Sequence, residues 1–166
     1  MTREHYIAMT NRTRRAVAHL PGGTKMLSVP TVLCAACYLV MLAQLAWQQD
    51  ERVIRAALVP ASVFVLVTVL RPLLHRQRPY DRFGVEPVGS WQPNKGKSMP
   101  SRHAASAAAI AFSVMWVHPS ASVILFMGLL CAGICMLRVL TGKHYPSDVA
   151  VALLIAGAMS LIGYTI

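Results

Sequence analysis

Three short clusters of basic, hydroxyl and acidic residues carry the side chains that could do chemistry. They lie in the stretches RPLLHRQRPYDRFG, MPSRH and LRVLTGKHYPSDVA, which begin at Arg71, Met99 and Leu137. Arginine presents a planar, permanently charged fork that matches phosphate oxygens, and several arginines together suit a multiply charged anion. The clusters therefore predict a binding site for a phosphate group.

Two histidines accompany the arginines and turn a binding site into a candidate reactive one. Imidazole is partly deprotonated near neutral pH, so His103 and His144 could each act as nucleophile or proton donor. Asp148 follows His144 by four residues, and its carboxylate in the first turn of a helix could accept from one ring nitrogen. The other nitrogen would then be free to attack phosphorus. We therefore expect His144 to be the nucleophile and His103 the acid.

The rest of the sequence is that of a membrane protein. Its 166 residues are 55% hydrophobic and only 13% charged, which is too apolar for an ordinary soluble domain. Five apolar stretches are near the roughly 20 residues that cross a bilayer as a helix, and none alternates as a barrel strand does. The predicted fold is all-α, a multi-span transmembrane helical bundle. The predicted spans are Met26–Trp47, Val53–Leu70, Pro100–Val117, Ala121–Leu137 and Val149–Ile166.

The arrangement of these spans places the three clusters together. Residues 1–25 are too polar to cross and predict an interfacial amino-terminal helix, followed by one transmembrane domain, residues 26–166. If the spans alternate in direction, all three clusters share one face, where a loop over residues 71–102 carries seven of the 16 Lys and Arg residues. Pro100 and Pro146 predict two helix starts on this face, and the free amides of such starts bind anions.

The spacing of these residues resembles the three-part signature of the type 2 phosphatidic acid phosphatase superfamily, which includes integral membrane lipid phosphatases and soluble vanadium haloperoxidases. The resemblance covers roughly half of the chain. The matching residues stand in the order Arg71-x6-Arg78-Pro79, Pro100-Ser101-x-His103 and Arg138-x5-His144-x3-Asp148.

The resemblance implies a helical core, no metal or other cofactor, and a covalent phosphohistidine intermediate. By position it makes His144 the nucleophile, Asp148 the residue that orients it, and His103 the proton donor to the leaving group. The residues that it assigns to the phosphoryl oxygens are Arg71, Arg78, Arg138 and Ser101.

Three positions depart from the usual pattern of this family. Arg71 stands where lysine is usual and keeps the charge, and Leu137 replaces a serine and removes one possible hydrogen bond. Arg102 replaces a glycine with a long cation, so we expect it to contact a second phosphate or a head group.

The predicted substrate is a lipid phosphate that is held at the membrane boundary while its tail stays in the bilayer. A polyprenyl diphosphate or phosphate, phosphatidylglycerophosphate and phosphatidic acid all fit, and the sequence does not separate them. One alternative is a non-enzymatic membrane protein that binds anionic head groups. A vanadate-dependent haloperoxidase fits less well, because five spans replace a large soluble scaffold. Nucleic acid is not an expected partner, since no recognition motif is present.

The remaining basic residues bear on location rather than on chemistry. Basic residues gather on the face of the clusters, so the positive-inside rule favours a cell-membrane protein with a cytoplasmic active site. The sequence does not specify an oligomeric state. The cations outside the signature that we expect to contact water or head groups are Arg76, Arg82, Lys95 and Lys97.

Overall fold

The structure is a bundle of helices, in agreement with the predicted fold class. It is a computed structural model that describes residues 2–89 and 97–166, and these ranges contain no strand. Residues 90–96 of the expected loop 71–102, with Lys95 among them, lie outside the described residues. The elements are α1 (Arg3–Ala18), η1 (Gly23–Ser28), α2 (Val29–Trp47), α3 (Arg52–Leu74), α4 (Pro79–Phe83), α5 (Arg102–Val117), α6 (Ala121–Leu140) and α7 (Pro146–Thr165).

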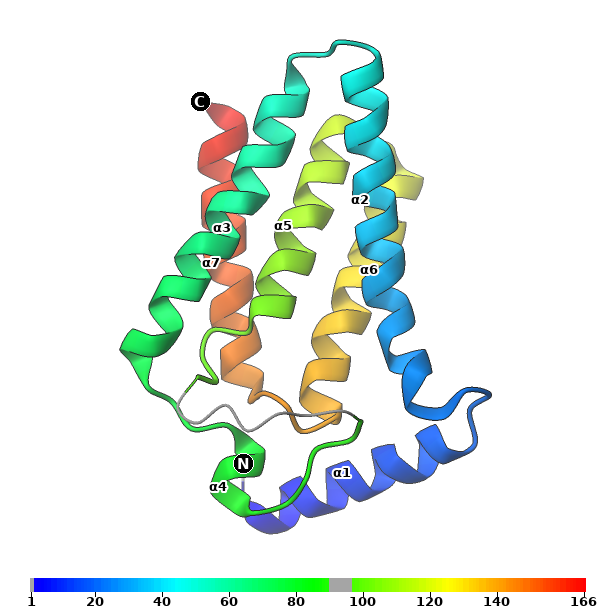
Figure 1. The fold of residues 1–166 in the computed structure, drawn as a ribbon, viewed down its shortest axis with the longest axis vertical. Coiled ribbons are helices and arrows are strands. Elements are labelled where there is room, and N and C mark those ends of the chain that lie inside the picture. The colour runs from blue at the N-terminus through cyan, green and yellow to red at the C-terminus, as the bar shows by residue number, and fades with distance from the viewer. Residues whose placement is uncertain (1, 90–96) are drawn as a thin grey trace.

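Helix α5 is the centre of the bundle. It packs against α2, α3, α6 and α7, and Figure 1 shows it framed by these four helices. Small side chains allow this close packing. The six alanines that we expect at helix contacts are all buried, namely Ala104, Ala105, Ala107, Ala108, Ala109 and Ala111.

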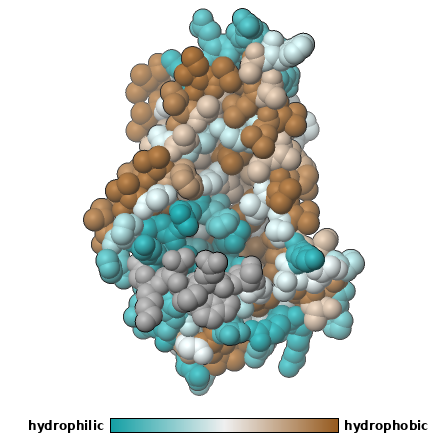
Figure 2. Space-filling view, viewed as in Figure 1, coloured by the Kyte–Doolittle hydropathy of each residue, from teal (hydrophilic) through white to brown (hydrophobic). Residues whose placement is uncertain are grey.

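Four helical segments are long and apolar enough to cross a membrane, and α5 is the exception to the predicted five. The four are Gly23–Trp47, Arg52–Phe83, Ala121–Leu140 and Pro146–Thr165. Their outward side chains are apolar, with Leu154 72% and Leu125 65% exposed. Figure 2 shows hydrophobic residues mainly over the middle of the visible face and hydrophilic residues towards both ends. A bundle with this surface is a membrane protein.

The start of α5 differs from the expected start at Pro100. The helix begins at Arg102 because Ser101 is its N-cap, with a side-chain oxygen that accepts from the amide of Ala104 at 3.4 Å. With 16 residues, α5 is about 24 Å long. Its N-cap lies level with Asp148, the third residue of α7, because the amide of Ser101 donates to the carbonyl of Asp148 at 3.1 Å. Helix α5 therefore begins deeper in the bundle than α7 does (Figure 1).

Helix α1 lies across the end of the bundle where the loops gather (Figure 1). Its Tyr6 is fully buried. The hydroxyl oxygen of Tyr6 lies 3.2 Å from the carbonyl oxygen of Val85 and 3.2 Å from that of Gly142. Gly142 adopts φ +75°, and a Cβ there would come within 2.6 Å of the Tyr6 hydroxyl. The polar segment that we expected at the interface thus packs directly on two loops of the candidate site.

Candidate active site

The first cluster begins on the last turn of α3. This helix continues past the expected end at Leu70 and includes Arg71, whose side chain is buried. The guanidinium of Arg71 donates through Nε to the carbonyl of Lys97 at 3.1 Å, and Nη2 also donates to this carbonyl. Arg71 therefore connects the end of α3 to the loop that leads into α5. We had expected this side chain to bind phosphate, and a contact with the loop was not predicted.

Arg78 stands directly before the short helix α4, which starts at Pro79. Its guanidinium lies over the ring of Tyr80, with 5.6 Å between Cζ and the ring centroid. The Nε atom of Arg78 is buried and has no hydrogen-bond partner among the described residues. A buried donor without a partner costs free energy, and an oxygen of a bound ligand could satisfy this atom.

The third cluster forms the turn between α6 and α7. Arg138 lies in the last turn of α6, and its carbonyl accepts from the amides of Lys143 at 3.2 Å and His144 at 3.1 Å. The side chain of His144 is buried. Burial lowers the pKa of His144 below its ordinary value, and the charges of Arg78 and Arg71 act in the same direction, while Asp148 opposes them. The lowered pKa favours the neutral imidazole, the form that a histidine nucleophile needs.

Asp148 is fully buried in the first turn of α7. Its Oδ2 atom lies 3.5 Å from Nδ1 of His144, beyond the length of a well-formed hydrogen bond. The same oxygen accepts from the Ser98 hydroxyl at 2.5 Å and from the Tyr145 amide at 2.9 Å. The carboxylate faces His144 as expected, but its hydrogen bonds go to other residues.

Arg76 supplies the ion pair of this carboxylate, which corrects the expectation that it contacts head groups. Its Nη1 atom donates to Oδ1 of Asp148 at 2.8 Å and to the Ser147 hydroxyl at 2.9 Å. Arg76 lies outside the three-part signature. Its position two residues before Arg78 was the only signal in the sequence, and nothing there marked Ser98.

The second cluster lies beside the third because the starts of α5 and α7 are joined. The Ser101 amide is occupied by the Asp148 carbonyl, so only its hydroxyl proton remains for a ligand. His103, in the first turn of α5, lies within electrostatic range of Arg138, His144, Arg102 and Lys143. The two histidines, about 40 residues apart in the sequence, therefore belong to one site.

The site holds an excess of positive charge. Among the described residues, Arg78, Arg102, Arg138 and Lys143 form no ion pair, since the pairs there involve only Asp50 and Asp148. Burial lowers the pKa of Lys143, as do the charges of Arg138 and Arg78. Crowded cations without acidic partners repel one another, and a bound anion would relieve this repulsion.

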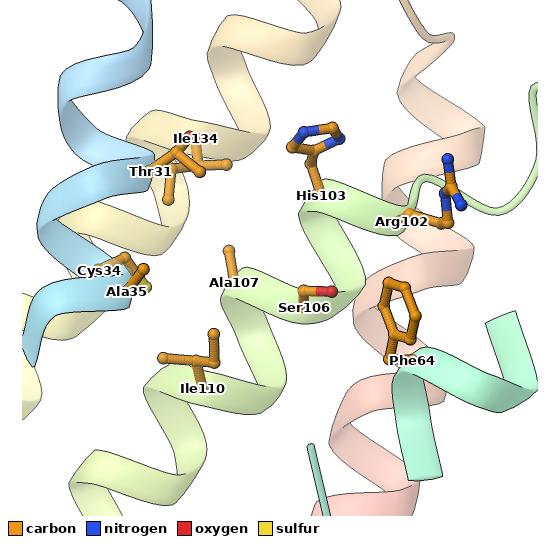
Figure 3. Close-up of a pocket in the computed structure, with 10 residues that line it drawn as sticks. All are labelled: Thr31, Cys34, Ala35, Phe64, Arg102, His103, Ser106, Ala107, Ile110 and Ile134. Atoms are coloured by element: carbon orange, nitrogen blue, oxygen red, sulfur yellow. The ribbon is translucent and has the colours of Figure 1, made fainter. Parts of the chain in front are cut away.

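Some of these cations line two cavities. One of about 400 Å³ runs along α5 between α2, α3 and α6, and is mainly apolar beyond His103 and Arg102. Figure 3 shows these two residues at the first turn of α5, with Ala107 and Ile110 further along it. The other, also about 400 Å³, is lined by Lys25, Arg138 and Lys143 with Thr24, Leu27, Ser28, Gly89, Leu137 and Thr141.

Sequence comparison decides the family. A sequence model of the PAP2 superfamily matches residues 52–166, which is more than half of the chain. The chain belongs to the PAP2 superfamily. A phosphatase is the enzyme class that this match supports for the chain. A comparison with curated protein sequences finds no match.

Two solved structures share the fold. LpxE of Aquifex aeolicus is 24% identical, with a TM-score of 0.73, and the match covers 98% of this chain and 94% of LpxE. A transmembrane PAP2-type phosphatidylglycerolphosphate phosphatase from Bacillus subtilis is 22% identical, with a TM-score of 0.65, and the match covers 99% of this chain and 89% of that one. The match extends over α1 and α2, beyond the region of the family model.

Proposed function

We propose that this PAP2 protein removes the terminal phosphate from a lipid phosphate, with His144 as nucleophile. The observation that carries the proposal is the position of His103 and Arg102, which line the mainly apolar cavity and also belong to the cationic site. Ligand sites combine apolar walls with a few placed polar groups in this way. A lipid tail in the cavity would place the phosphate among the cations.

The proposed first step is attack by Nε2 of neutral His144 on phosphorus. The bond between phosphorus and the lipid oxygen breaks, its electron pair stays on that oxygen, and His103 gives the oxygen a proton. Because His103 lies where the tail enters, the leaving group is the lipid side of the substrate. The negative charge of a bound phosphate favours protonated His103, which burial and the surrounding cations otherwise disfavour.

The second step returns the enzyme to its starting state. His103, now neutral, takes a proton from water as the water oxygen attacks the phosphohistidine, and the bond between phosphorus and nitrogen breaks to give inorganic phosphate. Arg78, Arg138 and the first amides of α5 would stabilise the charge on the equatorial oxygens. Asp148 would keep the proton of His144 on Nδ1. In this scheme the cations stabilise the negative charge that a metal ion stabilises in other phosphatases.

The proposed substrate class contains polyprenyl diphosphates and phosphates, phosphatidylglycerophosphate and phosphatidic acid. Arg102 lines the cavity, so it would contact the proximal phosphate of a diphosphate. We test this class by phosphate release from a panel of these lipids in micelles, with the purified protein. His144→Ala should lower activity by about 10³-fold or more and abolish an acid-labile phosphoenzyme. A protein that binds the panel but releases no phosphate would be a head-group-binding protein instead.

We also propose that the site faces the cytoplasm across the cell membrane. Five Lys and Arg residues precede α2, whereas the short connection between α2 and α3 and the start of α3 carry only Arg52 and Arg55, and the positive-inside rule then sets the orientation. Gln77 is exposed in the site loop, so Gln77→Cys offers a labelling position. An impermeant thiol reagent should label this cysteine only after intact cells are opened. Labelling in intact cells would reverse the orientation.

A further inference from the structure

We propose that Arg76 is a positioning residue that acts on His144 through Asp148, by sharing the charge of this carboxylate and fixing its direction. The inference rests on the proposed nucleophilic role of His144. Arg76 lies outside the signature of the family, and its contacts alone carry the assignment.

Arg76 contacts three residues that follow His144, namely Tyr145, Ser147 and Asp148. Nη1 donates to Oδ1 of Asp148 at 2.8 Å and to the hydroxyl of Ser147 at 2.9 Å, and the guanidinium lies over the ring of Tyr145, with 4.5 Å between Cζ and the ring centroid. Both hydrogen bonds come from Nη1, while the planar guanidinium stacks on the tyrosine ring, an arrangement that suits arginine better than the compact charge of lysine. The loop that follows α3 therefore holds the turn between α6 and α7 in place.

The backbone of Arg76 closes a ring of contacts around Asp148. Its carbonyl accepts from the amide of Ser98 at 2.9 Å, and the hydroxyl of Ser98 donates to Oδ2 of Asp148 at 2.5 Å. Arg76 thus holds Oδ1 directly and, through its carbonyl, holds the Ser98 that bonds Oδ2. Oδ2 keeps its direction towards Nδ1 of His144 at 3.5 Å, although its other bonds are the shorter ones.

The electrostatic consequence follows from the charges that surround His144. The imidazole interacts electrostatically with four residues from different elements. They are Arg71 of α3, Arg78 directly before α4, His103 of α5 and Asp148 of α7. Asp148 is the one acid in this set, so it alone favours the protonated form of His144. Arg76 offsets part of its charge. The pair therefore keeps His144 neutral and nucleophilic while Asp148 still directs its ring.

Three variants test the proposal. Arg76→Met removes the charge and keeps most of the side-chain length, Arg76→Lys keeps the charge without the fork, and Ser98→Ala removes the bond to Oδ2. The control is Arg52→Met, because Arg52 makes an exposed ion pair with Asp50, at 2.6 Å, on the opposite end of the bundle. The readouts are the pH dependence of kcat/KM on a lipid phosphate and the NMR titration of His144 in isotope-labelled protein.

We expect Arg76→Met to move the acid limb of the rate profile and the titration of His144 upward by roughly half a pH unit or more. Ser98→Ala should move the acid limb and the titration of His144 in the same direction. This variant still tests the proposal if Arg76→Met does not fold. Arg76→Lys should move them less, and Arg52→Met should not move them. Loosened packing that admits water would move the Lys and Met variants equally, so an equal shift overturns the proposal.

Two other results would also overturn it. A loss of activity in Arg76→Met without any change in the titration of His144 would mean that the residue only supports the fold. A rise in KM alone would mean that Arg76 binds the head group of the substrate. If the wild-type protein releases no phosphate from any lipid, the proposed function fails, whereas the titration of His144 still tests the role of Arg76.

Discussion

The amide of Ser101 donates a hydrogen bond to the carbonyl of Asp148 at 3.1 Å, and this bond joins the N-cap of α5 to the first turn of α7. It fixes how far α5 can slide along α7. His103 follows Ser101 by two residues and His144 precedes Asp148 by four, so the bond also sets the separation of the two histidines. The geometry of the proposed reaction thus depends on a backbone contact that substitutions at Ser101 other than proline leave in place.

The pH dependence of activity should reflect the lowered pKa of His144. Because burial lowers this pKa below its ordinary value of 6.5, His144 stays neutral and activity should persist below pH 6.5, then fall as the pH drops through the folded-state pKa. Between pH 6.5 and the lower folded-state pKa the unfolded protein binds the additional proton, so the free energy of unfolding should fall across that window. Rate profiles and unfolding measured from pH 4 to 8 check both. An acid limb above pH 6.5 would contradict the assignment.

Gly142→Ala should reduce both stability and activity because α1 packs against this glycine. A Cβ at Gly142 would lie 2.6 Å from the Tyr6 hydroxyl and 2.8 Å from Cγ2 of Thr10, so α1 must move. The matched control is Gly84→Ala, where φ is +63° and no atom lies within 4 Å. Both variants bear a backbone cost of about 1 kcal/mol, and thermal unfolding should show an additional loss for Gly142→Ala alone. Equal losses would mean that the α1 contact contributes little.

Filling the apolar cavity should impair lipid substrates selectively. Ile110 lines this cavity, and Ile110→Trp should raise KM for a long-chain lipid phosphate by about tenfold, equivalent to about 1.4 kcal/mol, with less effect on a short alkyl phosphate. Ile124→Trp is the control, since Ile124 is 47% exposed on the outside of α6. If Ile110→Trp affects both substrates equally, the tail does not occupy this cavity.

Chelators should leave activity largely unchanged, because the proposed mechanism stabilises phosphate charge with arginines and amides. The measurement is phosphate release before and after treatment with EDTA and with a zinc-selective chelator. Restoration of a lost activity by Mg²⁺ or Zn²⁺ would defeat the scheme.

The sequence alone predicts the helical fold and the meeting of the three clusters, because both follow from strong local signals. Long apolar stretches indicate membrane helices, and Pro146 marks the start of α7 as expected. Hydropathy does not distinguish a side chain that faces lipid from one that faces another helix. The alanine-rich stretch after His103 therefore predicts a span, whereas in the structure it is a short internal helix.

Residues that act through tertiary contacts escape such an analysis. Arg76 is one of several arginines in a loop, and its contact with Asp148 spans 72 positions of sequence. Tyr6 lies 136 positions from Gly142, so nothing local indicates its role. Arg71 matches a signature position, yet its guanidinium contacts the Lys97 carbonyl. A motif fixes which residues gather, and the contacts of each depend on the folded chain.

The recessed start of α5 affects how substrate, water and product would reach and leave the site. His103 lies about one helical turn further into the bundle than the first residue of α7, so in the proposed reaction a lipid anchored in the leaflet would present its phosphorus with little withdrawal from the acyl layer. Helix α1 packs on the loops at Val85 and Gly142, so in the proposed reaction water and inorganic phosphate would pass beside these contacts. We expect turnover to respond more to changes in that aqueous passage than to the ease of extracting lipid.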